Sequence, residues 1–284
     1  MDPQHIGKIR VTNFIDSVEH WSPRLLFTDI TYDDLKANGD WLRPHFLDED
    51  CKLLLSIHAF VVQTDRHTIL VDTCLGEDKK RGFAQWNMRK SPFLDVMTAG
   101  GFPPESIDYV FCTHMHVDHV GWNTRLDNGR WVPTFPNAKY LFHKTEWDFW
   151  KSSDHEEGEL EVITDSVLPV IEAGQVQWVD NDFAIDDCLH LEPTPGHTPG
   201  HCAVHLSSAG EEGVITGDMI HHPVQIGEPL RGCSADADPA QANATRKQFV
   251  ERYADTNVRI LGTHFHHPTA LRIVDQGGRT RPTM

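Results

Sequence analysis

The sequence lacks any long apolar run. No stretch of 18 consecutive apolar residues occurs in its 284 residues, and the segment 1–8 has no apolar core of the kind that secretory signals carry. We therefore expect a soluble, cytoplasmic protein that does not cross a membrane.

Paired cysteines and positive charge are also scarce. The six cysteines form no C-x-x-C pair, so we expect reduced, mostly buried thiols. Lys and Arg number 25 against 42 Asp and Glu, which gives a formal charge of −17 at pH 7. This charge opposes binding to nucleic acid or to an anionic membrane and disfavours a nuclease. A small substrate that is neutral or weakly charged fits it better.

Histidine, in contrast, is abundant, and it gathers at one place. Of the 19 His residues, three lie with an aspartate inside Thr113-His-Met-His-Val-Asp-His119, directly after the apolar run 109–112. That run predicts a short buried strand, so the cluster is expected on the loop that leaves the strand. Imidazole and carboxylate are the ligands that Zn²⁺ and similar divalent ions accept. A polar surface loop rich in His is the alternative, and it leaves the density of four such groups in six positions unexplained.

The remaining pattern predicts an α/β chain. Expected strands lie at 6–15, 53–62, 68–72, 109–112, 138–142, 176–179, 188–191, 202–206, 214–216 and 258–261, and a turn at Asn128-Gly129 predicts a hairpin. Expected helices lie after Ser91-Pro92, at 145–150, at 164–173 and from Asp238 to about 254. The acidic run 154–159 is interpreted as a solvated loop, and 20–50 has no clean period. The length fits one domain over 1–284, with 1–50 as an N-terminal wrap or rim and 51–275 as the core.

Three further candidate ligands occupy the same kind of place. His197 lies in the turn-rich loop Pro193–His201, Asp218 follows the expected strand 214–216, and His264 follows the expected strand 258–261. Side chains delivered by the ends of several strands commonly form a single site in α/β folds.

These motifs together resemble those of the metallo-β-lactamase superfamily. The resemblance rests on His114-x-His116-x-Asp118-His119, Gly196-His-Thr-x-Gly-His201, Thr216-Gly-Asp218 and Gly262-Thr-His264, and it covers about residues 50–275. It implies an αββα sandwich with a site for two divalent ions, most simply Zn²⁺, with Mn, Fe or Co as alternatives. Among its members the chain looks closest to the N-acyl homoserine lactonases and the methyl parathion hydrolase group, which implies a homodimer. Asp72 resembles the family's early strand-end aspartate, whose role is mainly structural.

The resemblance also assigns the ligands. It gives one ion to His114, His116 and His197, the second to Asp118, His119 and His264, and makes Asp218 the bridge. Two such ions lower the pKa of a shared water toward neutrality, which allows hydrolysis without a side-chain nucleophile. Thr113, Thr216 and Thr263 are candidates for orienting these ligands, and Trp41, Phe83, Trp86 and Trp122 for an apolar substrate wall.

One position departs from the family pattern. The lactonases carry a tyrosine three residues after the bridging aspartate, where this chain has His221. Histidine can donate a hydrogen bond to an oxyanion or protonate a leaving group, so Asp118 and His221 are the candidate catalytic residues. A rim histidine without a catalytic part is the alternative for His221.

The sequence therefore predicts a dinuclear metal hydrolase that opens a lactone or cleaves a related ester. An organophosphate or aryl ester hydrolase would use the same site. An iron-dependent oxidoreductase of the persulfide dioxygenase kind is the alternative from another class, since the fold also serves such enzymes.

Overall fold

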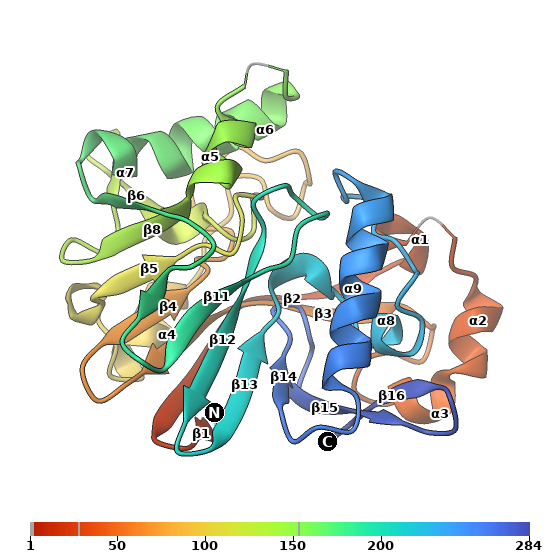
Figure 1. The fold of residues 1–284 in the computed structure, drawn as a ribbon. Helices are drawn as coiled ribbons and strands as arrows, with labels where there is room; N and C mark the ends of the chain where they lie inside the picture. Colours follow the sequence, from red (N-terminus) through yellow and green to blue (C-terminus); the bar gives the residue numbers. More distant parts are fainter. Residues whose placement is uncertain (1–2, 28, 153) are drawn as a thin grey trace. The chain divides into compact units, whose positions relative to one another are not determined.

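The computed structural model describes residues 3–27, 29–152 and 154–284, which form two compact units (Figure 1). The first unit comprises Met1–Asp16 and Ile57–Asp180, and the second comprises Ser17–Ser56 and Asn181–Met284. No helix among the described residues is long and apolar enough to cross a membrane. The prediction of one domain over residues 1–284 depends on how these two units are joined. It stays a prediction.

The first unit is built on a mixed sheet. The strand order is β1 (Gln4–Ile6), β2 (Ile9–Trp21), β3 (Leu53–Gln63), β4 (Thr68–Val71), β5 (Tyr109–Phe111), β8 (Lys139–His143) and β9 (Val176–Val179). The part of β2 after Asp16 and the part of β3 before Ile57 belong to the second unit. The predicted strands are thus present, and β3 is buried along almost its whole length, as an apolar strand in a sheet centre should be. A two-stranded hairpin, β6 (Thr124–Asp127) and β7 (Arg130–Pro133), turns at Asn128-Gly129 as expected.

Parallel pairing decides where the loops of this unit lie. β4, β5, β8 and β9 pair in parallel, so the carboxyl ends of β4, β5 and β8 share one edge of the sheet. Asp72 follows β4, the segment 113–119 follows β5, and α5 (Lys144–Trp150) follows β8. The histidine-rich loop therefore has the end of β4 on one side and α5 on the other.

The helices of the first unit differ from the expectation at one place. The unit also contains α4 (Phe93–Ala99), α6 (Glu157–Val162), a π-turn at Ile163–Val167 and α7 (Leu168–Glu172). The predicted loop over the acidic run 154–159 is wrong for its second half, because α6 begins at Glu157. The side chain of Glu159 accepts a hydrogen bond from the Glu156 N–H, and acidic residues in a first turn favour helix initiation.

The second unit contains the other sheet. Its order is β10 (Ala184–Ile185), β11 (Leu189–Pro193), β12 (Cys202–Ser208), β13 (Glu211–Ile215), β14 (Arg259–Leu261), β15 (Ala270–Asp275) and β16 (Thr280–Thr283). β13 and β14 are parallel and β12 is antiparallel to β13, so the start of β12 and the ends of β13 and β14 share one edge. Three loops meet there, and they carry His197, Asp218 and His264.

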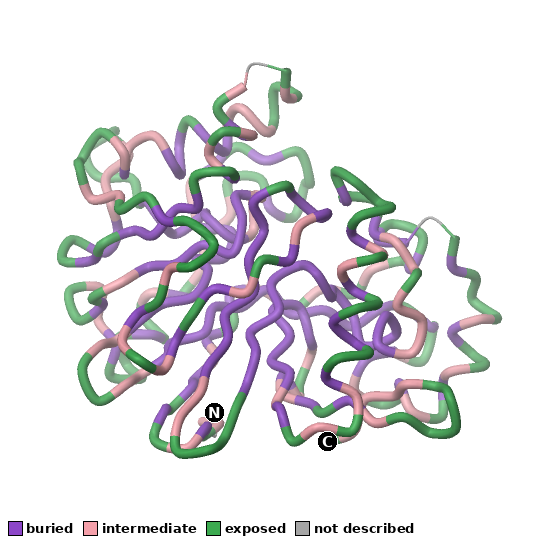
Figure 2. Tube along the Cα trace, viewed as in Figure 1, coloured by how far each residue is buried: buried purple, intermediate pink, exposed green. Residues whose placement is uncertain are grey.

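Helices pack on this second sheet. They are α1 (Pro23–Leu26), α2 (Tyr32–Ala37), α3 (Gly39–Leu42), α8 (Val224–Gly227) and the longer α9 (Pro239–Tyr253). Asp238 caps α9 as predicted, since its side chain accepts a hydrogen bond from the Gln241 N–H. The short helices in 20–50, α8, β10, β15 and β16 were not predicted. Figure 2 shows that buried residues follow the strands of each unit, while exposed residues lie in the connecting turns and along the helices.

A close backbone approach supports the histidine-rich loop. The Gly121 N–H donates to the Cys74 carbonyl at 2.7 Å, and a methyl group at Gly121 would lie 2.0 Å from the Leu75 carbonyl carbon. We expect Gly121→Ala to lower the free energy of unfolding by about 2 kcal/mol or more, because backbone atoms must move apart. Urea denaturation measures this. Gly82→Ala, where an added methyl group meets nothing within 4 Å, should change it by less than about 0.5 kcal/mol.

A buried carboxylate on α5 holds the same loop. Glu146 is 1% exposed, and its Oε1 accepts hydrogen bonds from the Met115 N–H at 3.0 Å and from the Trp150 indole at 2.6 Å. Trp150 in turn packs edge-on against His116. We expect Glu146→Ala to cost about 2–4 kcal/mol of unfolding free energy, because two buried donors lose their acceptor. Asp148→Ala, at an exposed position of the same helix, is the control, and an equal loss there would refute this role of Glu146.

Candidate metal-binding residues

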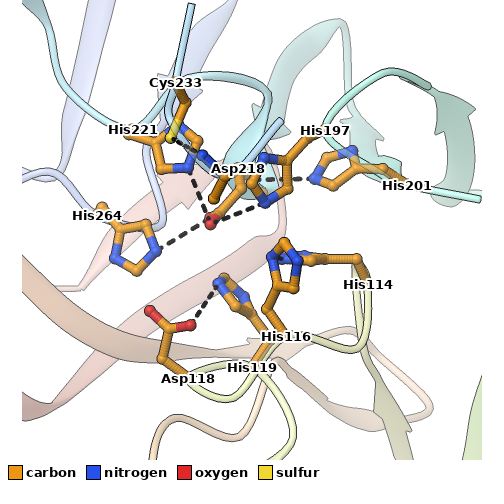
Figure 3. A network of polar contacts seen from close by, with 12 residues as sticks. His114, His116, Asp118, His119, His197, His201, Asp218, His221, Cys233 and His264 are labelled. Carbon is orange, nitrogen blue, oxygen red and sulfur yellow. Dashed lines mark hydrogen bonds and ion pairs between the residues drawn. The ribbon is translucent and has the colours of Figure 1, made fainter. Parts of the chain in front are cut away.

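Four of the predicted ligands lie together in the first unit. His114, His116, Asp118 and His119 occupy the loop after β5, and we call them the first half-site (Figure 3). The rings of His114 and His119 lie 4.0 Å apart, and Nε2 of His114 is 3.0 Å from Nδ1 of His116. Nε2 of His119 is 3.7 Å from Oδ1 of Asp118. The loop thus turns all four side chains toward one region, as the spacing predicted.

Two of these rings are held at Nδ1. The Asp72 carboxylate accepts from Nδ1 of His119 at 2.9 Å, and the Thr113 hydroxyl lies 3.1 Å from Nδ1 of His114. Asp72 also accepts from the Thr113 N–H and hydroxyl. Its φ of 60° is one that L residues rarely adopt, so the backbone after β4 is shaped to deliver this carboxylate. Asp72 therefore orients His119, beyond the structural role that the resemblance implied.

The other predicted ligands lie together in the second unit. We call His197, Asp218 and His264 the second half-site, and His221 lies against it. Nε2 of His264 is 3.0 Å from the Asp218 carboxylate, and Nε2 of His197 is 3.5 Å from it (Figure 3). Nε2 of His221 lies 3.2 Å from it as well. The carboxylate is buried, so three imidazole rings surround one anionic group inside the protein.

The Nδ1 atoms in this half-site also have acceptors. Nδ1 of His197 lies 2.9 Å from Oδ1 of Asp236, and Nδ1 of His264 lies 3.2 Å from the Ser56 carbonyl. A nitrogen beside a carbonyl or carboxylate oxygen carries the proton, so in the neutral ring Nε2 is the one with the lone pair. Two hydrogen-bond acceptors, imidazole Nε2 and a carboxylate oxygen, then face each other.

Such a pair of acceptors repels. The proton that His221 presents to Asp218 offsets part of this repulsion, and a cation near the acceptors would offset the rest. Protonation of His197 is not the remedy, because burial lowers the pKa of its ring to about 4, although Asp236 and Asp218 act in the opposite direction. His197 is therefore neutral at pH 7. Neutral imidazole nitrogens and carboxylates in this arrangement fit a divalent metal ion.

His221 differs from His197 and His264, the two predicted ligands beside it. Burial lowers the pKa of its ring, but Cys233 and Asp218 outweigh this and raise the pKa well above the usual value. The thiol of Cys233 lies beside the ring, and the Gln225 side chain holds the His221 N–H at 2.8 Å (Figure 3). His221 therefore presents a proton at Nε2 toward Asp218, which suits a donor better than a ligand.

The neighbours predicted to orient ligands are correct only in part. Thr113 contacts His114, whereas the Thr216 hydroxyl donates to the Gly217 carbonyl. His201 accepts from the Asp218 N–H at 2.9 Å and holds that backbone. Trp122 stacks on Phe93 and is buried, so its assignment to a substrate wall is wrong. Sequence reasoning missed Asp236, Cys233 and Glu146, which no motif marks.

Comparisons with known proteins agree with the motifs. The sequence profile of the family described as the Metallo-beta-lactamase superfamily matches residues 54–264. An N-acyl homoserine lactonase of Bacillus thuringiensis is 23% identical over 177 residues, which is 58% of this chain. The match spans 64% of that relative, so the chain covers just under two thirds of its length.

Solved structures show the same fold. A crystal structure of the hydrolase AbOPH, in the β-lactamase superfamily, is 25% identical with a TM-score of 0.83 and covers 99% of this chain and 96% of that one. AidC, a dizinc quorum-quenching lactonase in complex with a product, is 24% identical with a TM-score of 0.82 at the same coverage. The predicted α/β class and metallo-β-lactamase fold are confirmed. Because the family profile matches more than half of the chain, this protein belongs to the metallo-β-lactamase superfamily.

Proposed function

We propose that the chain is a dinuclear metal hydrolase that opens a lactone or a closely related ester. Its support is the family membership, the likeness to N-acyl homoserine lactonases and the likeness to AidC, which is described as a dizinc quorum-quenching lactonase in complex with a product. The observation that carries the proposal is the buried Asp218 carboxylate, faced by the Nε2 atoms of His197 and His264. The neutral ring of His197 and this carboxylate suit a cation.

The two half-sites supply a complete set of ligands for two ions. We propose that His114, His116, His197 and Asp218 would hold one ion and that Asp118, His119 and His264 would hold the other. The family resemblance adds Asp218 to the ligands of the second ion. Zn²⁺ suits this set of nitrogen and oxygen donors, which also accepts Mn, Fe or Co. When bound, two such ions lower the pKa of a water toward neutrality and polarise a carbonyl oxygen.

The side chains of the protein provide orientation and protons. Asp72, Thr113, Asp236 and the Ser56 carbonyl fix the rings of the ligands through Nδ1. Asp118 acts as a ligand and accepts the proton of the attacking water. His221 donates a hydrogen bond to the oxygen on which charge develops, where the lactonases use tyrosine. The net charge of −17 favours a neutral or weakly charged substrate. Cytoplasmic location and a homodimer stay predictions.

Metal content and a substrate panel test this proposal together. We expect about two zinc ions per chain, with turnover of γ- or δ-lactones exceeding that of an aryl ester and a phosphotriester. Asp218→Ala should lose at least one ion and about 10³-fold or more in kcat/KM. Asp182→Ala, at an exposed position, is the control.

Other outcomes would redirect or refute the assignment. If the phosphotriester is hydrolysed fastest, the proposed substrate class changes to phosphotriesters, and the proposed metal chemistry stands. One iron per chain, no hydrolysis, and oxygen uptake with a thiol substrate would overturn the proposal in favour of an oxidoreductase.

His221 has a test of its own. We expect His221→Phe to lower kcat by about 10²–10³-fold with the metal content unchanged, because a donor is lost and no ligand is removed. His221→Tyr should retain more activity than His221→Phe, since its hydroxyl can also donate. Loss of metal in His221→Phe would instead make this residue a ligand.

A neighbouring histidine provides the control. His222 is buried, and its Nε2 lies 2.8 Å from the Phe46 carbonyl, so it holds structure only. His222→Gln should lower stability while kcat stays within about threefold.

A further inference from the structure

A buried carboxylate stands behind His197. Asp236 lies in the segment that joins α8 to α9, and its side chain is fully buried. Oδ1 accepts the hydrogen bond from Nδ1 of His197 at 2.9 Å, while Oδ2 accepts from the Cys233 N–H at 2.8 Å. Both carboxylate oxygens are therefore directed by separate donors.

A fully buried arginine stands behind this carboxylate. Arg246, on α9, is 0% exposed, and its Nη2 lies 3.5 Å from Oδ2 of Asp236. An isolated buried carboxylate costs several kcal/mol, and a positive partner offsets that cost. Arg246 therefore allows Asp236 to stay ionised in the protein interior.

The other nitrogens of Arg246 bind the loop that carries Asp218. Nε donates to the Met219 carbonyl at 2.7 Å, and Nη1 donates to the carbonyls of Arg231 at 2.9 Å and Pro229 at 3.2 Å. One side chain thus binds the residue after Asp218 and the segment that leads to Asp236. The planar guanidinium suits several fixed acceptors, which a lysine could not bind together.

The loop of His197 is fastened to the same segment through its backbone. The Ala237 N–H donates to the His197 carbonyl, and the Asp238 N–H donates to the Gly196 carbonyl, each at 2.9 Å. Gly196 has a φ of +131°, and a methyl group there would lie 2.2 Å from the Ala242 nitrogen. The loop therefore approaches α9 closely, with His197 facing Asp236.

We infer that Asp236 and Arg246 are positioning residues that hold His197 in the tautomer with the proton on Nδ1. This inference rests on the proposed function, because it makes Nε2 the atom available to a metal ion. Asp236 fixes the orientation of the His197 ring and the position of its proton. Arg246 fixes Asp236 and the loop that carries Asp218 relative to each other. His197, Asp236 and Arg246 all lie within the second unit.

The tautomer of His197 can be read without any metal. Long-range ¹H–¹⁵N correlation spectra of the metal-free protein, with His197→Gln used for assignment, should show the proton of His197 on Nδ1. A neutral ring with its proton on Nε2 would overturn the inference. This measurement requires only the wild type and a folded His197→Gln variant.

Zinc affinity provides the second readout. In Asp236→Asn the one amide oxygen cannot serve both sides. If it faces the Cys233 N–H, the amide nitrogen faces His197 and the required tautomer loses its acceptor; if it faces His197, the amide nitrogen opposes the Cys233 N–H, and a neutral oxygen replaces the stronger carboxylate acceptor. We expect a 10- to 100-fold weaker zinc affinity by chelator competition. Asp238→Asn is the matched control two residues away, because it is exposed and asparagine also caps helices well. Arg246→Lys should weaken zinc binding in the same direction.

The outcomes separate this inference from the proposed function. If the wild type and a folded Asp236→Asn bind two zinc ions equally well, Asp236 does not position His197 for a metal ion. The hydrolase proposal would still stand. A wild type that binds no divalent ion would refute the hydrolase proposal. The tautomer of His197 would then be the only test of whether Asp236 and Arg246 position this ring.

Discussion

The structure depends on one buried anion, the Asp218 carboxylate, with imidazole nitrogens on several sides. Fixed acceptors at Nδ1 of His197 and His264 turn lone pairs toward this carboxylate. Without a cation that arrangement costs free energy, and with one it becomes a set of ligands. The stability of the second half-site and its function are therefore linked.

Strand ends explain how each unit gathers its polar groups. In the first unit the parallel strands β4, β5 and β8 bring Asp72, the histidine-rich loop and Glu146 to one sheet edge. In the second unit β12, β13 and β14 do the same for His197, Asp218 and His264. Buried side chains then fix the loops, with Glu146 and Asp72 in one unit and Arg246 and Asp236 in the other. The candidate ligands of each half-site are thus held by residues that would not themselves bind an ion.

The sequence marks the candidate ligands more clearly than the residues that support them. Ligand spacing such as His114-x-His116 is local, and strands before Asp218 and His264 could be recognised from their apolar runs. Asp236 lies 39 residues from His197, and only the folded chain brings them together. In the sequence, Glu146 cannot be told from an ordinary helical glutamate. It is buried because β5 pairs with β8, which places α5 beside the histidine-rich loop. The start of α6 was missed because solvated charges and a helix-initiating first turn have the same composition.

Anomalous diffraction at the zinc absorption edge, from crystals of the zinc-loaded protein, tests the central claim most directly. We expect two peaks, with Asp218 contacting both, and imidazole nitrogens from both half-sites about 2.0–2.1 Å from the ions. His221 should lie outside the ligand distance. A single peak held by one half-site alone, zinc bound at other residues, or no peak at His197 and Asp218 would contradict the account.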